Sequence, residues 1–183
     1  PRVFQRFRAR IEQALAASSL KRGLFSLTVA LGWRKFERRA SKMEQALLRL
    51  LQPLVAGPVL NRLGGRLRLT VVGGAALELR VARSFIGLGL SMIQGYGLTE
   101  ASPIVAGNRE HDNDPVTVGA PLSSVAVRVN EAGELLVRGP SVMLGYWEDP
   151  EVNPLVRGII RSGMTSPMAA EMVRRMVAEG PFQ

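Results

Sequence analysis

Apolar side chains recur at helical spacing through the first fifty residues. The spacing predicts an amphipathic helix over 3–17, with arginines between its apolar positions. Gly23 interrupts the pattern, so we expect a second helix over about 24–32 and a third over about 33–52, ended by Pro53. The apolar positions of the first helix are Phe4, Phe7, Ile11 and Leu15. The amino-terminal third is therefore predicted to be helical.

The pattern changes after Gly64 and Gly65. Residues 66–72 alternate at first and then become continuously apolar, which predicts a buried strand. A glycine turn follows at 73–76, then a short helix over about 77–88 and a second strand over 90–94. Strand, turn, helix and strand in this order are typical of a parallel βαβ unit.

Short strands joined by turns are expected beyond Pro103. The candidates are 116–118, 125–129 and 134–138, and the last two form a hairpin around a turn at 131–133. Residues 141–154 resemble a loop, and a last helix is expected over about 166–179. The predicted fold class is α/β: a parallel βαβ core, preceded by basic helices and followed by short antiparallel strands.

The composition of the chain excludes several kinds of catalytic and metal site. The chain has 183 residues and no cysteine, which excludes a disulfide scaffold, a thiolate metal site and a cysteine nucleophile. His111 is the single histidine and disfavours a Ser-His-Asp triad; its acidic neighbours in 109–115 follow no metal-ligand spacing, so we interpret that segment as a surface loop. Apolar residues make up 46%, as in globular chains, and no apolar stretch reaches the roughly 20 residues of a membrane span.

Positive charge is concentrated at the amino-terminal end. Residues 1–50 contain twelve lysines and arginines against three glutamates, a net charge of +9, whereas residues 51–183 are neutral overall. This charge is typical of a solvated helical face, but it also fits an anionic neighbour such as membrane headgroups. We expect no nucleic acid partner, because no recognised binding motif or series of stacking aromatics is present.

Two glycine-containing strings follow the two predicted strands. Gly73, Gly74 and Ala75 come directly after the first, where small residues let a ligand approach the backbone, although glycines there are also common in simple turns. After the second strand comes the string Gln94-Gly95-Tyr96-Gly97-Leu98-Thr99-Glu100.

The second string has two interpretations. In the functional one, Tyr96 stacks on a flat ring, Thr99 contacts a phosphate and Glu100 holds a magnesium ion that bridges phosphates. In the structural one, Tyr96 belongs to the core of a tight turn and Glu100 is the acid that begins a helix. A third string, Gly133–Trp147, reads as a hairpin strand followed by a loop with aromatic side chains.

Taken in order, the three strings resemble the AMP-forming acyl-CoA synthetases of the adenylate-forming superfamily. QGYGLTE is similar to that family's adenine- and magnesium-binding motif, GELLVRGPSVMLGYW to its next block, and GGAAL to the turn before both. Upstream residues around 1–4, 19–22 and 63–68 resemble the long-chain fatty acyl branch. The resemblance covers about residues 1–153.

The resemblance implies a two-step ligase reaction. A fatty acid carboxylate attacks the α-phosphate of ATP to give acyl-AMP with release of pyrophosphate, and coenzyme A then displaces AMP as the acyl thioester forms. Carried over by residue, Gly95 and Tyr96 flank the adenine, and Gln94 and Gly97 belong to the same cofactor-binding string. Thr99 contacts phosphate and Glu100 binds Mg²⁺, and these two are the catalytic pair. The implied ligands are ATP or AMP, Mg²⁺, coenzyme A and a fatty acid, and Gly73, Gly74 and Ala75 line the junction of the nucleotide and acyl pockets.

The chain also departs from that family's pattern. We find no Ser/Thr/Gly-rich phosphate loop with its lysine, and Met164 stands where the resemblance implies an aspartate that binds the ribose. We therefore expect an internal fragment that is inactive alone. Its expected parts are an adenylation segment over 1–153, comprising basic helices at 1–58 and a nucleotide-site segment at 64–153, and an atypical tail over 154–183.

Two other interpretations stay open at this point. One is a non-catalytic remnant or partner-binding piece of such an enzyme, and the other is a basic module that binds anionic lipid or nucleic acid. Cytoplasmic location is expected, with peripheral contact at the inner face of the membrane through residues 1–50 as one option.

Overall fold

The computed structural model describes residues 2–131, 134–148 and 160–162. The chain forms two compact units: Pro1–Val71 with Leu77–Met92, and Val72–Ala76 with Ile93–Gln183. The expected helix over 166–179, Met164, the centre of the turn at 131–133 and part of the loop over 141–154 lie outside the described residues.

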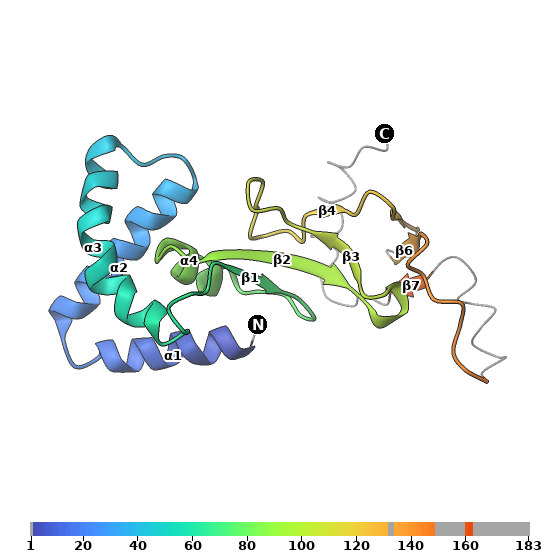
Figure 1. The fold of residues 1–183 in the computed structure, drawn as a ribbon, viewed down its shortest axis with the longest axis horizontal. Coiled ribbons are helices and arrows are strands. Elements are labelled where there is room, and N and C mark those ends of the chain that lie inside the picture. Colours follow the sequence, from blue (N-terminus) through green and yellow to red (C-terminus); the bar gives the residue numbers. More distant parts are fainter. Residues whose placement is uncertain (1, 132–133, 149–159, 163–183) are drawn as a thin grey trace. The chain divides into compact units, whose positions relative to one another are not determined.

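The first unit contains four helices (Figure 1). They are α1 (Arg2–Leu15), α2 (Ser19–Phe36), α3 (Lys42–Asn61) and α4 (Leu79–Gly87). The amphipathic helix expected over 3–17 is confirmed as α1. Helix α2 packs against both α3 and α4. The rings of Phe4 of α1 and Phe85 of α4 form a T-shaped pair with a centroid distance of 5.0 Å. The core of this unit therefore lies where α4 meets the other helices.

The predicted break at Gly23 is wrong. Helix α2 begins at Ser19, where the Ser18 hydroxyl accepts a hydrogen bond from the amide of Lys21, and continues through Gly23 to Phe36. A glycine inside a helix costs only about 1 kcal/mol, which neighbouring helix-forming residues and packing can offset. The helix ends instead before Arg38, whose φ of +59° lies in the left-handed region.

The third predicted helix has the wrong limits as well. Helix α3 begins after Ser41 in a capping box, in which Ser41 and Glu44 each bond the other's backbone amide. It passes through Pro53 and Pro58, both exposed, before it ends at Asn61. Among the described residues, no helix is long and apolar enough to cross a membrane.

Glycines bring α2 and α4 into close contact. A Cβ atom added to Gly32 would lie 1.8 Å from the carbonyl oxygen of Gly87, and one added to Gly87 would lie 2.5 Å from that of Val29. Gly32 and Gly87 are both buried. The two helix backbones therefore touch where no larger residue fits.

A four-stranded mixed sheet has the order β1-β2-β3-β4. Its strands are β1 (Leu69–Val72), β2 (Ser91–Gly97), β3 (Ile104–Gly107) and β4 (Ala120–Pro121), and α4 connects β1 to β2 as predicted. β3 is antiparallel to both neighbours. The expectation that β1 is a buried strand is wrong for most of it, since Val72 is buried but Leu69 and Val71 are exposed.

The second sheet has the order β5-β6-β7. The predicted hairpin is confirmed as β5 (Ala126–Val129) and β6 (Leu135–Arg138), antiparallel with Val127 opposite Val137, and β7 (Ile160–Ser162) pairs with β6. The predicted strand at 116–118 is wrong. There the Asp114 carbonyl accepts the amide of Thr117, and the segment turns.

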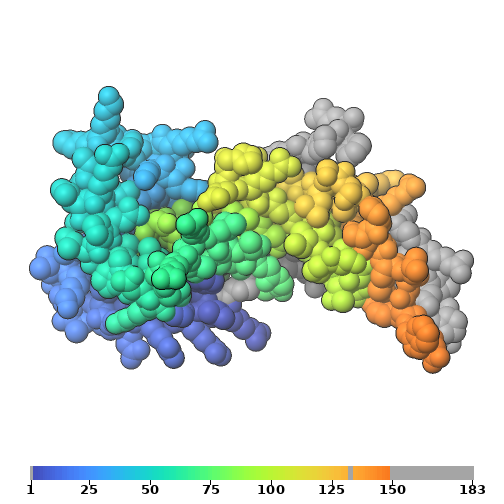
Figure 2. Space-filling view, viewed as in Figure 1, coloured from blue at the N-terminus to red at the C-terminus, as the bar shows by residue number. Residues whose placement is uncertain are grey.

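Large apolar side chains are exposed along α3. Met43, Leu47, Leu50 and Leu54 recur at helical spacing and lie on the surface. Figure 2 shows α3 and the turn before it at the surface of the first unit.

Candidate functional site

The glycine turn after β1 lies against the second string. Gly74 has a φ of +76°, a left-handed conformation that favours glycine. A Cβ atom on Gly73 would come within 3.3 Å of the Gly95 carbonyl oxygen. Gly73, Gly74 and Ala75 are exposed. The structure thus brings the first two strings together and leaves the small residues of the glycine turn accessible.

The first half of the second string continues β2. Gly95 and Tyr96 pair with Gly107 and Ala106 of β3, and the register is irregular between Tyr96 and Gly97. A Cβ atom on Gly97 would lie 1.7 Å from the carbonyl oxygen of Pro103, so only glycine fits there. Tyr96 is partly buried and packs against the core of this unit, as the structural interpretation predicts.

The second half of the string forms a short 3₁₀ turn, η1 (Thr99–Ala101). Thr99 is exposed and Glu100 is partly exposed, so both side chains can reach a ligand. Ser102 closes the turn with a φ of +58°. Glu100 therefore begins a helical turn, and its carboxylate also remains accessible; the structural and functional interpretations are compatible at this residue.

The third string holds Glu100 in place. The Tyr146 hydroxyl donates a hydrogen bond to a carboxylate oxygen of Glu100, and the Met143 amide donates to the Glu100 carbonyl oxygen at 2.8 Å. The bond from Tyr146 lowers the pKa of the Glu100 carboxyl below its ordinary value, because it stabilises the charged form. Tyr146 belongs to the third string, but its sequence position alone did not predict that it is a site residue.

Gln94 has a different environment from the rest of the string. It is 3% exposed, and its amide nitrogen donates to the carbonyl oxygens of Pro115 and Thr117 at 3.0 and 3.2 Å. Asn108 is also buried and donates to the Thr117 carbonyl at 2.8 Å. Together the two amides fix the segment 108–119. Sequence reasoning missed Asn108, because a lone asparagine after a short strand carries no recognisable signal.

The donor groups of this site fit a magnesium ion bound through phosphates. Within the described part of the chain, no cluster of three or more histidine, aspartate or glutamate side chains is present. Magnesium is commonly bound through one or two carboxylates, with phosphates and water completing its octahedron. Glu100 supplies one ionised carboxylate, which suits that arrangement and would not hold the ion alone.

The sequence and the site together define the class of protein. Residues 1–147 match the family described as AMP-binding enzyme. The match covers most of the chain and includes all three strings, so the chain belongs to the AMP-binding enzyme family.

Relatives within that family are named as fatty acid ligases. The chain is 35% identical over 155 residues to the long-chain-fatty-acid–CoA ligase FadD15 of Mycobacterium bovis, covering 82% of this chain and 26% of that protein. It is 34% identical to FadD15 of Mycobacterium tuberculosis over the same shares, and 41% identical to a long-chain-fatty-acid–CoA ligase of Yersinia pestis over 46% of this chain and 17% of that protein. The chain therefore spans about a quarter of the length of the mycobacterial relatives.

Solved structures of acyl-CoA ligases are similar to part of this chain. A malonyl-CoA ligase ternary product complex is 31% identical, with a TM-score of 0.49, over 61% of this chain and 27% of that one. The ligase FadD1 of Archaeoglobus fulgidus is 22% identical, with a TM-score of 0.46, over 61% of this chain and 29% of that one.

Proposed function

We propose that this chain forms the adenine and magnesium side of the active site of an AMP-forming long-chain fatty acid–CoA ligase. In this proposal Gly95 and Tyr96 lie against the adenine, Gly97 belongs to the same nucleotide site, Thr99 bonds a phosphate oxygen and Glu100 ligates Mg²⁺. The fatty acid and coenzyme A are the co-substrates that the relatives' names indicate.

The accessible Thr99–Glu100 turn at the end of β2 is the observation that carries the proposal. The glycine turn at 73–75 lies against Gly95 of the same string, and the hydrogen bond from Tyr146 lowers the pKa of the Glu100 carboxyl. Small residues permit close approach of a phosphate, a hydroxyl can donate to it, and a carboxylate can bind the accompanying cation. When bound, magnesium would offset phosphate charge.

Binding of ATP to the 183-residue chain tests this assignment. Calorimetric titration with and without Mg²⁺ should show tighter binding with the metal. Replacing Glu100 by glutamine keeps the shape and removes the charge, so we expect the magnesium-dependent gain to fall by about tenfold, or about 1.4 kcal/mol.

Glu131→Gln is the matched control, since Glu131 is exposed and lies in none of the three strings. It should bind as the wild type does. Magnesium dependence that survives Glu100→Gln intact, or a wild-type chain that binds no ATP, would contradict the proposal.

A further inference from the structure

A hollow lies within the first unit, where α1, α2 and α4 meet. Its volume is about 490 Å³, within the range of small-molecule sites. Four arginines line it, Arg8 from α1, Arg22 from α2, and Arg80 and Arg83 from α4, against one lining carboxylate, Glu12. The hollow is therefore strongly cationic.

One wall of the same hollow is apolar. Leu15 of α1 and Phe25, Val29 and Ala30 of α2 line it. On α2, Phe25 and Val29 share a face with Arg22, because the three are spaced by three, four and seven residues. A ligand that fits both parts must combine an anionic group with a hydrocarbon portion.

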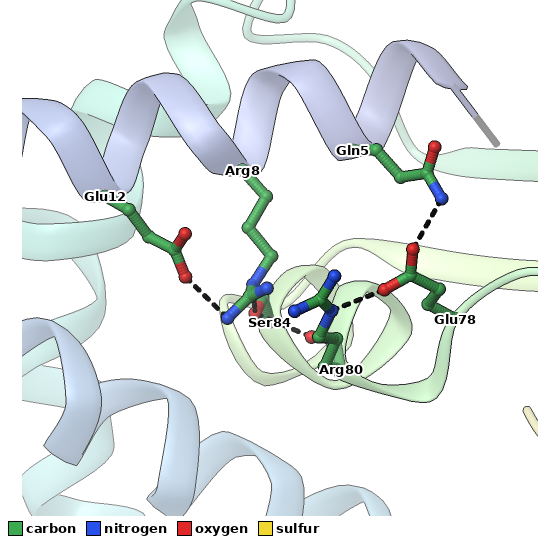
Figure 3. Close-up of polar contacts among 6 residues, drawn as sticks. All are labelled: Gln5, Arg8, Glu12, Glu78, Arg80 and Ser84. Atoms are coloured by element: carbon green, nitrogen blue, oxygen red, sulfur yellow. Dashed lines mark hydrogen bonds and ion pairs between the residues drawn. The ribbon is translucent and has the colours of Figure 1, made fainter.

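Buried and charged partners fix the orientation of two of the arginines (Figure 3). Arg8 donates through Nε to the Ser84 hydroxyl at 3.0 Å and pairs with Glu12, and buried Ser84 in turn donates to the Arg80 carbonyl. Arg80 pairs with Glu78, which also accepts a hydrogen bond from Gln5 of α1. These contacts connect α1 to the start of α4, and Arg8, Arg80 and Ser84 line the hollow beside them.

The other two arginines keep their charge available. Among the described residues, none provides Arg22 or Arg83 with a carboxylate partner. Arg22 donates to the Ala16 carbonyl at 3.0 Å, and the Arg83 guanidinium lies 5.7 Å from the centre of the Trp33 ring. Both side chains can bind an anion without breaking an ion pair between described residues.

We propose that this hollow is a binding site for a single-chain amphiphilic anion, separate from the nucleotide site. The anionic head, a carboxylate or a phosphate, pairs with Arg22 and Arg83, and guanidinium groups suit both heads. The hydrocarbon chain lies along Leu15, Phe25 and Val29. The proposal does not depend on the function proposed for the Thr99–Glu100 turn.

Trp33 provides a direct readout, because it contacts one of the binding arginines. The chain has two tryptophans, so Trp147→Phe leaves Trp33 as the only source of tryptophan emission. Dodecyl phosphate, added below its critical micelle concentration, should give a saturable change in that emission and a matching heat in calorimetry. Laurate tests the carboxylate head, inorganic phosphate tests the head alone, and dodecyl maltoside tests the chain alone.

We expect both anionic amphiphiles to bind at least about tenfold more tightly than phosphate or the maltoside. Arg22→Gln should weaken binding about tenfold, whereas Arg49→Gln on α3, an exposed arginine that does not line the hollow, should leave it unchanged. Ser26→Phe fills the hollow from an exposed position, keeps every arginine and should also weaken binding. Glu100→Gln should have no effect.

Several results would overturn the proposal. The first is that neither emission nor calorimetry shows saturable binding, or that dodecyl maltoside binds as tightly as dodecyl phosphate. The second is that Arg22→Gln and Arg49→Gln change the affinity equally, or that Ser26→Phe keeps the wild-type affinity. The third is that the chain binds anionic vesicles but no monomeric amphiphile.

Discussion

Glu100 is the residue at which the two interpretations of its string differ in consequence. Suppose residues 1–147 of this chain replace the matching segment of the Mycobacterium tuberculosis ligase. If Glu100 binds magnesium on the nucleotide phosphates, Glu100→Gln should slow adenylation about 10²–10³-fold. Thioester formation from supplied acyl-AMP should change much less. Both half-reactions are measured over a range of magnesium concentrations.

Equal adenylation rates at every magnesium concentration would remove Glu100 from the site. If Glu100 only begins a helical turn, Glu100→Gln should lower the free energy of unfolding by about 1 kcal/mol or less and leave both half-reactions nearly intact.

Tyr146 should control the ionisation of Glu100. Tyr146→Phe removes the hydroxyl that donates to the carboxylate, so the pKa of Glu100 should rise toward its ordinary value. A side-chain carboxyl titration by ¹³C NMR measures this directly. Glu44, whose carboxylate accepts from the Ser41 amide, should titrate as before in the same spectra. An unshifted Glu100 curve would show that the Tyr146 bond does not set its pKa.

The order of the residues in the second string predicted which side chains lie together, but not what each one does there. Thr99 and Glu100 are accessible, as a phosphate and metal site requires. The partners of Glu100 and Gln94 lie about 20 to 50 positions away in sequence, at Tyr146, Pro115 and Thr117. No local pattern specifies such pairs, so their roles emerge only from the folded chain.

At the scale of elements, the contact between α2 and α4 depends on Gly32. Gly32→Ala should lower the free energy of unfolding by about 1–3 kcal/mol, because the new methyl group would overlap the Gly87 carbonyl and force the helices apart. Gly23→Ala, in the same helix, has no atom within 4 Å of the new Cβ and should raise stability by about 0.5–1 kcal/mol. Urea unfolding compares the two. Effects of the same sign and size would refute the contact.

The capping box should make α3 sensitive to pH. Ser41→Ala removes the hydroxyl that accepts the Glu44 amide and should cost about 1 kcal/mol. Chiefly because the Ser41 amide donates to it, the Glu44 carboxyl has a lowered pKa. Its contribution is therefore present above the unfolded-state value of about 4.5 and lost as pH falls through the folded-state pKa.

Glu44→Gln separates the charge from the cap. The difference in unfolding free energy between this variant and the wild type should be largest near neutral pH and should shrink in acid. A difference that does not change with pH would mean that the ionised carboxylate contributes nothing.

Periodicity predicted that these helices exist, and it failed at their limits. It treated Gly23 and Pro53 as breaks, although both lie inside helices. Glycine or proline inside a helix costs a few kilocalories per mole at most, and tertiary contacts can offset this cost. The pair Ser41 and Glu44, three residues apart, was a usable signal for the true start of α3.

At the scale of the whole molecule, the 183-residue chain should not turn over. Its three lysines, Lys21, Lys35 and Lys42, all lie on α2 or α3, and the resemblance implies a lysine on a phosphate loop. Each missing electrostatic group of this kind typically costs about 10²–10³ in rate. Pyrophosphate release with ATP, magnesium, palmitate and coenzyme A should match a no-protein control.

The full-length Mycobacterium tuberculosis ligase, assayed in parallel, shows that the conditions support turnover. Steady pyrophosphate release by the 183-residue chain above background would show that turnover does not require the phosphate-loop lysine.

The membership of the chain in its family was predictable because three strings in fixed order carry far more information than any one of them. The arrangement of the sheets was less predictable. Strands β4 and β7 are only two and three residues long, and periodicity cannot resolve strands of that length.

The buried amide of Gln94 has a consequence for reading motifs. A search pattern that weights all seven letters of QGYGLTE equally treats its first letter as a contact with the ligand. Here that side chain fixes the segment 108–119 by offering protons to two backbone oxygens, and a carboxylate in its place would offer none. Glutamate at this position would therefore mark a chain with a differently shaped segment, even where the other six letters of the string are unchanged.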